Sequence, residues 1–218
     1  MLGLLLKDFF TLKKYVKTLL GILLVYAVWS YIIGDASFLS SFTVIIFSMV
    51  TITSIAYDEQ CHWNQYALTM PFPKTTHVLE KYVLGVLLCI LGTLLSLAGS
   101  IFISALNHTL TEDMTMLLVI SFLMFAIGLF FISVYLPLVF HFGPEKSRLV
   151  IMVVFLAPTI LLSLLSKATP ESLEALSEAL SVLEIKPLFS LICVFVFVLL
   201  VMVISLFTSF HIFKRKEF

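Results

Sequence analysis

The sequence predicts an all-α protein of six transmembrane helices, with an N-terminal interfacial helix, a cytoplasmic helix and an outer amphipathic helix. Composition is the first reason: 61% of the 218 residues are hydrophobic, 12% are charged and the mean hydropathy is +1.15, which excludes an ordinary soluble core. The second reason is that six stretches without acidic or basic residues are long enough to cross ~30 Å of hydrocarbon. The third is an uneven distribution of Lys and Arg. Residues 1–218 therefore form a single membrane domain.

The first 17 residues have the pattern of an interfacial helix. Apolar side chains share one helical face: Leu2, Leu5, Leu6, Phe9, Leu12 and Val16. Lys7, Thr11 and Lys14 lie on another face, whereas Lys13 falls on the apolar side and has to extend its amine toward water. A basic leader without this role is the alternative.

Six membrane spans are expected after this helix. They lie at 18–34, 37–57, 82–106, 114–140, 149–166 and 187–210. The fifth is short and contains Pro158, which a packed bundle tolerates.

The distribution of basic residues predicts the orientation. Of the 13 Lys and Arg, only Lys167 and Lys186 fall on the outer side when the N-terminus is inside, which leaves 11 on the inner side. Because short cytoplasmic loops carry the excess of Lys and Arg, both termini and the loop 58–81 are expected in the cytoplasm.

The outer loop 167–186 contains its own helical pattern. Thr169 can cap a helix that has Pro170 at its first position. Leucines occupy one face and glutamates the other: Leu173, Leu176, Leu180 and Leu183 against Glu171, Glu174 and Glu178. This helix either rests on the outer surface or plugs its vestibule, or it is a solvated cap on its own bundle.

The cytoplasmic loop 58–81 is the long polar interruption of the first half of the chain. Its apolar positions recur at the spacing of one helical face: Trp63, Tyr66, Ala67 and Met70. Asp58 is a candidate N-cap, Glu59 adds charge suited to a helix N-terminus, and Pro71 ends the helix. Trp and Tyr suit docking on a partner protein, and they also favour a membrane interface.

Small and hydroxylic residues follow single faces of two spans. Gly85, Gly92, Gly99 and Ser96 predict a close helix contact in the third span. The second span carries a hydroxylic stripe formed by Ser40, Thr43, Thr51 and Ser54. The stripe either lines a polar pathway or bonds to a neighbouring helix, and packing is the favoured interpretation.

Catalytic and metal-binding patterns do not occur in the sequence. GxxxxGK[ST], HExxH, GxSxG and SxxK are all absent, which argues against nucleotide binding and hydrolysis by this chain. Adjacent Cys61 and His62 lack a third ligand nearby, so neither a metal site nor another bound cofactor is expected. The protein is not expected to be an enzyme, and any energy it uses must come from a partner.

The cytoplasmic segment resembles that of the permease subunits of type-2 ABC exporters, particularly the small permeases of bacterial peptide-export systems such as the phenol-soluble modulin exporter. Members share an acidic pair, a tryptophan, a proline, a basic residue and a final Lys-Tyr or Arg-Tyr that enters the third span. The matching positions are Asp58-Glu59, Trp63, Tyr66-Ala67-Leu68, Pro71, Lys74, Val78 and Lys81-Tyr82. Lys74 stands where arginine is commoner, and the second proline, Pro73, is less usual.

The resemblance implies a transporter of two permease chains, identical or different, and two separate cytoplasmic ATPase subunits that bind ATP and Mg. The helix near Asp58 would be the coupling helix, inserted in a groove of the ATPase. Its expected contact residues are Asp58, Glu59, Trp63, Tyr66, Ala67, Met70, Pro71 and Lys74.

The expected cargo is a hydrophobic or amphipathic peptide, of the toxin or antimicrobial type, exported across the cytoplasmic membrane of a bacterial cell. Cargo would pass between the permeases, along their second and fifth spans. The partners are then the ATPase, a second permease, the lipid bilayer and the peptide, with no nucleic acid. Export of a lipid, polysaccharide or drug is one alternative. A membrane scaffold or immunity protein without transport activity is another.

Overall fold

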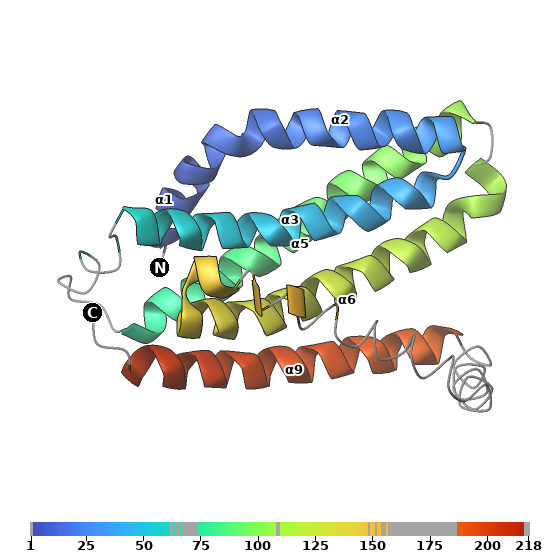
Figure 1. The fold of residues 1–218 in the computed structure, drawn as a ribbon. Helices are drawn as coiled ribbons and strands as arrows, with labels where there is room; N and C mark the ends of the chain where they lie inside the picture. Colours follow the sequence, from blue (N-terminus) through green and yellow to red (C-terminus); the bar gives the residue numbers. More distant parts are fainter. Residues whose placement is uncertain are drawn as a thin grey trace.

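The computed structural model describes residues 2–61, 63, 66, 74–107, 110–147, 149–150, 152–153, 156 and 187–215. These ranges contain helices and no strand, which confirms the all-α prediction. The elements are α1 (Leu2–Leu12), the 3-10 turn η1 (Lys13–Tyr15), α2 (Val16–Ile33), α3 (Ala36–Gln60), α5 (Lys74–Leu106), α6 (Leu110–Phe142) and α9 (Pro187–Arg215). Figure 1 shows the long helices side by side, with α2 and α9 at opposite edges of the bundle.

Five helices are long and apolar enough to cross a membrane. They are Gly3–Ile33, which includes α1 and α2, then Ala36–Gln60, Thr75–Leu106, Met114–Phe142 and Leu191–Lys214. The expected span 149–166 lies mostly outside the described residues, and the outer loop 167–186 lies entirely outside them. The segment 1–17, expected as an interfacial helix, comprises α1, η1 and the start of α2, which begins at Val16.

A short turn makes α2 and α3 antiparallel neighbours. Gly34 ends α2 with a φ of 80°, a left-handed conformation that glycine adopts without steric cost. Asp35 follows as the N-cap of α3, and its carboxylate accepts a hydrogen bond of 2.8 Å from the backbone N–H of Ser37.

Helices α6 and α9 run parallel to each other. The rings of Phe122 and Phe195 are 5.2 Å apart near the start of both helices, and those of Phe140 and Phe213 are 5.6 Å apart near their ends. The end of α6 and the start of α9 therefore lie at opposite ends of the bundle. Figure 1 places both chain termini at the same end, where α6 and α9 finish.

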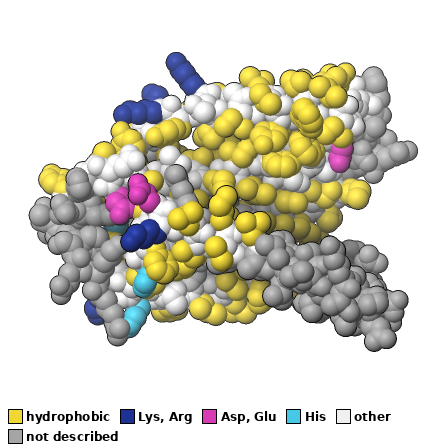
Figure 2. Space-filling view, in the orientation of Figure 1, with side chains coloured by type: hydrophobic (Ala, Val, Ile, Leu, Met, Phe, Trp, Pro, Cys, Tyr) yellow, Lys and Arg dark blue, Asp and Glu magenta, His cyan; other side chains and the backbone are white. Residues whose placement is uncertain are grey.

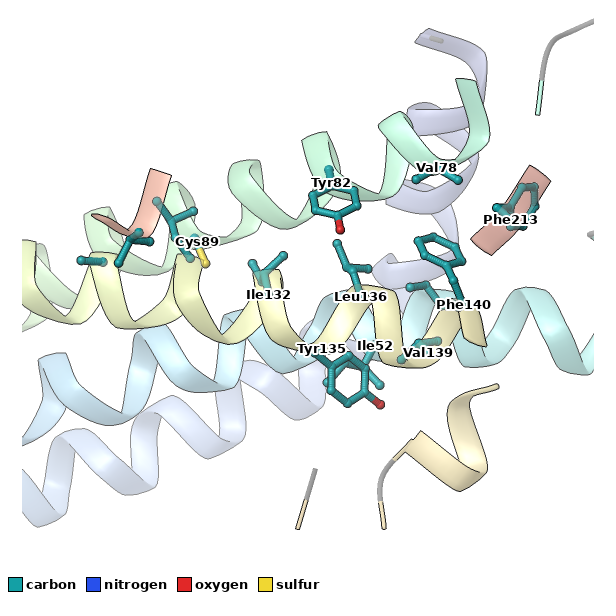
Figure 3. Packing of buried hydrophobic residues seen from close by; sticks show 14 residues of the cluster. Ile52, Val78, Tyr82, Cys89, Ile132, Tyr135, Leu136, Val139, Phe140 and Phe213 are labelled. Atoms are coloured by element: carbon teal, nitrogen blue, oxygen red, sulfur yellow. The ribbon is translucent and has the colours of Figure 1, made fainter. Parts of the chain in front are cut away.

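The largest buried cluster joins α3, α5, α6 and α9. Figure 3 shows part of it, with Tyr82, Ile132 and Leu136 at its centre. Further along α5, the helix backbone approaches α3 closely: a Cβ atom on Gly92 would lie 2.8 Å from Cβ of Phe47. Glycine allows this approach because it has no side chain.

Candidate functional site

A cluster of buried charges lies at the end of the bundle where α3 finishes and α5 begins. α1 contributes Lys7 and Asp8, the last turn of α3 contributes Asp58, and α5 contributes Lys81; we call these four residues the charge cluster. Three elements that are distant in sequence are thus joined at one point.

Each lysine of the charge cluster bridges both aspartates. Lys81 Nζ lies 2.5 Å from Asp8 Oδ2 and 2.6 Å from Asp58 Oδ2, and Lys7 Nζ lies 3.0 Å from Asp8 Oδ1 and 2.5 Å from Asp58 Oδ1. Lys81 also donates a hydrogen bond of 3.0 Å to Ser54 Oγ. The four charges sum to zero, which is the condition under which buried ions are tolerated.

The charge cluster is closed to solvent on all but one side. The side chains of Lys81, Asp8 and Asp58 are 0%, 1% and 5% exposed, whereas that of Lys7 is 24% exposed. Because removing one partner leaves an uncompensated buried charge, such contacts hold the joined helices in one arrangement.

His77 and Glu80 extend the polar region along α5. His77 Nδ1 lies 3.4 Å from Glu80 Oε2, and Glu80 Oε1 lies 3.8 Å from Lys81 Nζ. The imidazole also packs on Phe213 of α9, with ring centroids 5.6 Å apart. The start of α5 therefore contacts both ends of the chain.

Trp63 and Tyr66 lie next to the charge cluster. Lys7 Nζ is 4.5 Å from the centroid of the Trp63 ring, a cation-π distance, and the rings of Trp63 and Tyr66 are 5.4 Å apart. Tyr66 remains 57% exposed. Of the two aromatic residues singled out in the sequence, Trp63 contacts Lys7 of α1, and Tyr66 packs on Trp63 with more than half of its surface exposed.

The predicted start of the cytoplasmic helix is wrong in its details. Asp58 and Glu59 belong to the last turn of α3, which ends at Gln60, and do not cap a new helix. The ion pairs of Asp58 with Lys7 and Lys81 account for the longer helix. Lys74, expected in the following turn, is the first residue of α5. Ala67, Met70 and Pro71 lie outside the described residues.

The segment that follows α6, residues 143–146, lies against the end of α3. It was not singled out in the sequence. After α6, Gly143 turns the chain with a φ of 81°, and a Cβ atom on it would lie 3.1 Å from Glu59 Oε1. A groove of about 470 Å³ lies here, lined by Glu59, Gln60 and residues 143–146 among others. The pair Gly143-Pro144, followed by the charged Glu145 and Lys146, could have indicated a polar turn here.

The hydroxylic stripe of α3 faces other helices. Ser40 Oγ lies 2.8 Å from Ser100 Oγ of α5, Ser54 accepts from Lys81, and Thr43 donates to its own helix at Leu39 O. Thr51 is buried among them, at 1% exposure. In this arrangement all four side chains are enclosed in the bundle.

Tyr82, beside Lys81, ties α5 to α6 and α9. Ser205 donates its proton to the carbonyl of Ser133, so Tyr82 must donate to Ser205 at 2.6 Å and accept from Ser209 at 2.8 Å. The two adjacent residues thus connect α5 to two pairs of helices. Lys81 connects it to α1 and α3, and Tyr82 connects it to α9 and, through Ser205, to α6.

Comparison with known families gives one match. Residues 3–214 match the family described as ABC-2 family transporter protein, and no curated protein matches the chain. The match covers nearly the whole sequence and agrees with the apolar helical bundle. The chain therefore belongs to the ABC-2 family, whose members are membrane permeases of ABC exporters that work with an ABC ATPase.

Proposed function

We propose that this chain is one of two permeases in a bacterial exporter of hydrophobic or amphipathic peptides, and that its ATPase docks beside the charge cluster. The main support for this docking site is the position of Tyr66, which is exposed next to the charge cluster that joins α1, α3 and α5. A movement of a partner bound there would pass to all three helices at once.

The groove at Glu59 and Gly143 supports the same docking site. It brings the connection that follows α6 against the end of α3. An ATPase bound here would contact two connections of the permease. Lys146 lines the groove and is exposed, so charge complementarity would contribute to recognition.

The parallel arrangement of α6 and α9 supports the six-span topology. The chain leaves α6 at one end of the bundle and enters α9 at the other. We assign the return crossing to 149–166 and the outer amphipathic helix to 167–186. Both termini then lie on the cytoplasmic side, in agreement with the distribution of Lys and Arg.

The peptide cargo is proposed from the resemblance and from the chemistry of the spans. The stretches 18–34, 36–57, 82–106, 114–140 and 187–210 carry no acidic or basic side chain, and the buried polar groups within them are mainly hydroxyls. Such helices suit an amphipathic or lipid-like cargo better than a sugar or an ion. Ser40, Thr43, Thr51 and Ser54 remain the proposed pathway residues, exposed when the bundle rearranges.

Tyr66→Ala tests the docking site. Loss of an aromatic anchor at an interface often costs ~2 kcal/mol or more, which is roughly thirtyfold in affinity. The matched control is Tyr31→Ala, because Tyr31 is 52% exposed and lies at the far end of α2. ATPase co-purified from the native host is measured with each variant. Equal ATPase binding by Tyr66→Ala and Tyr31→Ala would remove the proposed docking site.

Reconstituted vesicles test the cargo. The permease and its ATPase are supplied with an amphipathic helical peptide, a phospholipid or a cationic drug, and hydrolysis is followed. Stimulation by the peptide supports the proposal. Stimulation by the lipid or the drug alone would assign a different cargo, and no stimulation would favour a scaffold.

A further inference from the structure

An apolar groove opens between the N-terminal helices and the rest of the bundle. It has a volume of about 450 Å³ and is lined by α1 and α2 on one side and by α3 and α5 on the other. Its floor includes Leu12, Phe47 and Leu88, which belong to a buried cluster. The volume lies in the range of ~300–1,000 Å³ found for sites that hold small molecules.

The groove lies along the membrane-crossing part of the helices. On α2 its lining extends from Val16 to Leu23, roughly 10 Å along the helix axis. On α5 it extends from Leu88 to Leu95, a similar length. Only 6% of the apolar 18-residue window within Gly3–Ile33 is buried inside the chain, so this side of the groove belongs to the outer surface of the bundle, where lipid would contact it.

Among the described residues that line the groove, Lys13 is the single charged one, and the others are apolar. It begins η1, the 3-10 turn that interrupts the helix between α1 and α2. The sequence had placed Lys13 on the apolar face of a continuous helix. In the structure Lys13 lies between the α1 and α2 parts of the lining and is exposed, so its ammonium group can extend from an apolar slot toward water.

The surroundings of Lys13 carry uncompensated positive charge. Lys14 and Lys17 are exposed on the same short segment, and the sequence contains no acidic residue between Asp8 and Asp35. Within the described part of the chain, none of these three lysines forms an ion pair. Figure 2 shows Lys or Arg side chains projecting beside hydrophobic surface at the end where α1 meets α2.

We propose that this groove binds an acyl chain of an anionic phospholipid whose headgroup phosphate pairs with Lys13. An apolar slot with an exposed cation in its lining has the complementary chemistry of a lipid with a negative headgroup. The bound lipid fills the space between α1–α2 and α3–α5, so it becomes a structural part of the permease. This site is separate from the proposed ATPase contact at Tyr66.

Native mass spectrometry of the full-length permease tests the headgroup. Phosphatidylglycerol and phosphatidylcholine with identical acyl chains are offered in equal amounts. The wild type should retain phosphatidylglycerol preferentially, and Lys13→Gln should reduce that preference about fivefold, the effect expected for one lysine at an anionic surface. Lys214→Gln is the control, because Lys214 is exposed on α9 and does not line the groove. Equal retention of both lipids by the wild type would overturn the proposal.

A bulky residue in the groove tests the acyl chain. Leu20 lines the groove and is 54% exposed, so Leu20→Trp fills the slot without disturbing the core and should prevent retention of either lipid. Leu24 lies one turn further on α2, is 66% exposed and does not line the groove, so Leu24→Trp should retain lipid like the wild type. Identical behaviour of the two variants would refute an acyl-chain site.

Two further outcomes would also contradict the proposal. Displacement of the lipid by inorganic phosphate alone would show a site for the phosphate group without an acyl slot. Disulfide-linked dimers through Leu20→Cys, in a chain whose native cysteines are replaced by Ala, would show that a second copy covers the groove. Retention of lipid in phosphate buffer and absence of this cross-link both support a lipid site.

Discussion

Replacement of Lys81 by Met should strongly destabilise the permease. Lys81 is fully buried and is within 2.6 Å of a carboxylate oxygen of both Asp8 and Asp58. In Lys81→Met, Lys7 is left to neutralise two buried aspartates, so one negative charge has no partner within the cluster. Breaking a buried ion pair from one side costs about 3–5 kcal/mol, and we expect a decrease of this size in the free energy of unfolding.

A second substitution that restores neutrality should recover most of this loss. Lys81→Met with Asp8→Asn leaves the pair Lys7–Asp58 at 2.5 Å, and the charges again sum to zero. A double-mutant cycle measured by denaturant unfolding in detergent should therefore give a coupling energy of about 2 kcal/mol or more. Lys214→Met controls for loss of an exposed lysine. The reasoning is refuted if Lys81→Met costs no more than Lys214→Met, or if the effects of the two cluster substitutions simply add.

Two further substitutions test the packing of α5. Gly92→Leu should lower the free energy of unfolding by about 1–3 kcal/mol, because even the new Cβ would lie 2.8 Å from Cβ of Phe47. The control is Gly21→Leu, which should leave the melting temperature unchanged because a Cβ there would have no neighbour within 4 Å. Tyr82→Phe should lower the free energy of unfolding by about 1–3 kcal/mol, because the buried hydroxyls of Ser205 and Ser209 on α9 both lose their hydrogen bond to Tyr82. Tyr31→Phe, at an exposed position, should leave the melting temperature unchanged. Equal melting temperatures within either pair would contradict the corresponding contact.

The sequence was sufficient for those parts of the fold that depend on local properties. Hydropathy over about 20 residues decides whether a helix can cross a membrane, and the five described helices that are long and apolar enough overlap five of the six expected spans. The turn between α2 and α3, at Gly34 and Asp35, falls where the expected spans 18–34 and 37–57 meet.

The candidate site could not be predicted in this way because its contacts are distant in sequence. Asp58 follows an apolar run and precedes a polar one, which is the local pattern of a helix N-cap. Its actual role depends on Lys7 and Lys81, and the first of these is 51 residues away. Asp8 gave no signal at all, since a single acid in a short amphipathic helix is usually solvated. Only the packing of α1 on α5 buries it.

The charge cluster also affects the order in which the protein is assembled during synthesis. Lys81 is translated 73 residues after Asp8, which at ~5–20 residues per second is a delay of roughly 4–15 s. Asp58 is made before Lys81, so for the last 23 residues of that interval, roughly 1–5 s, the two aspartates have only Lys7 to share, and burial of the excess negative charge would be costly. We therefore expect α1 to stay at the aqueous boundary until α5 is inserted, so that its final docking takes place only after α3 and α5 are both in place.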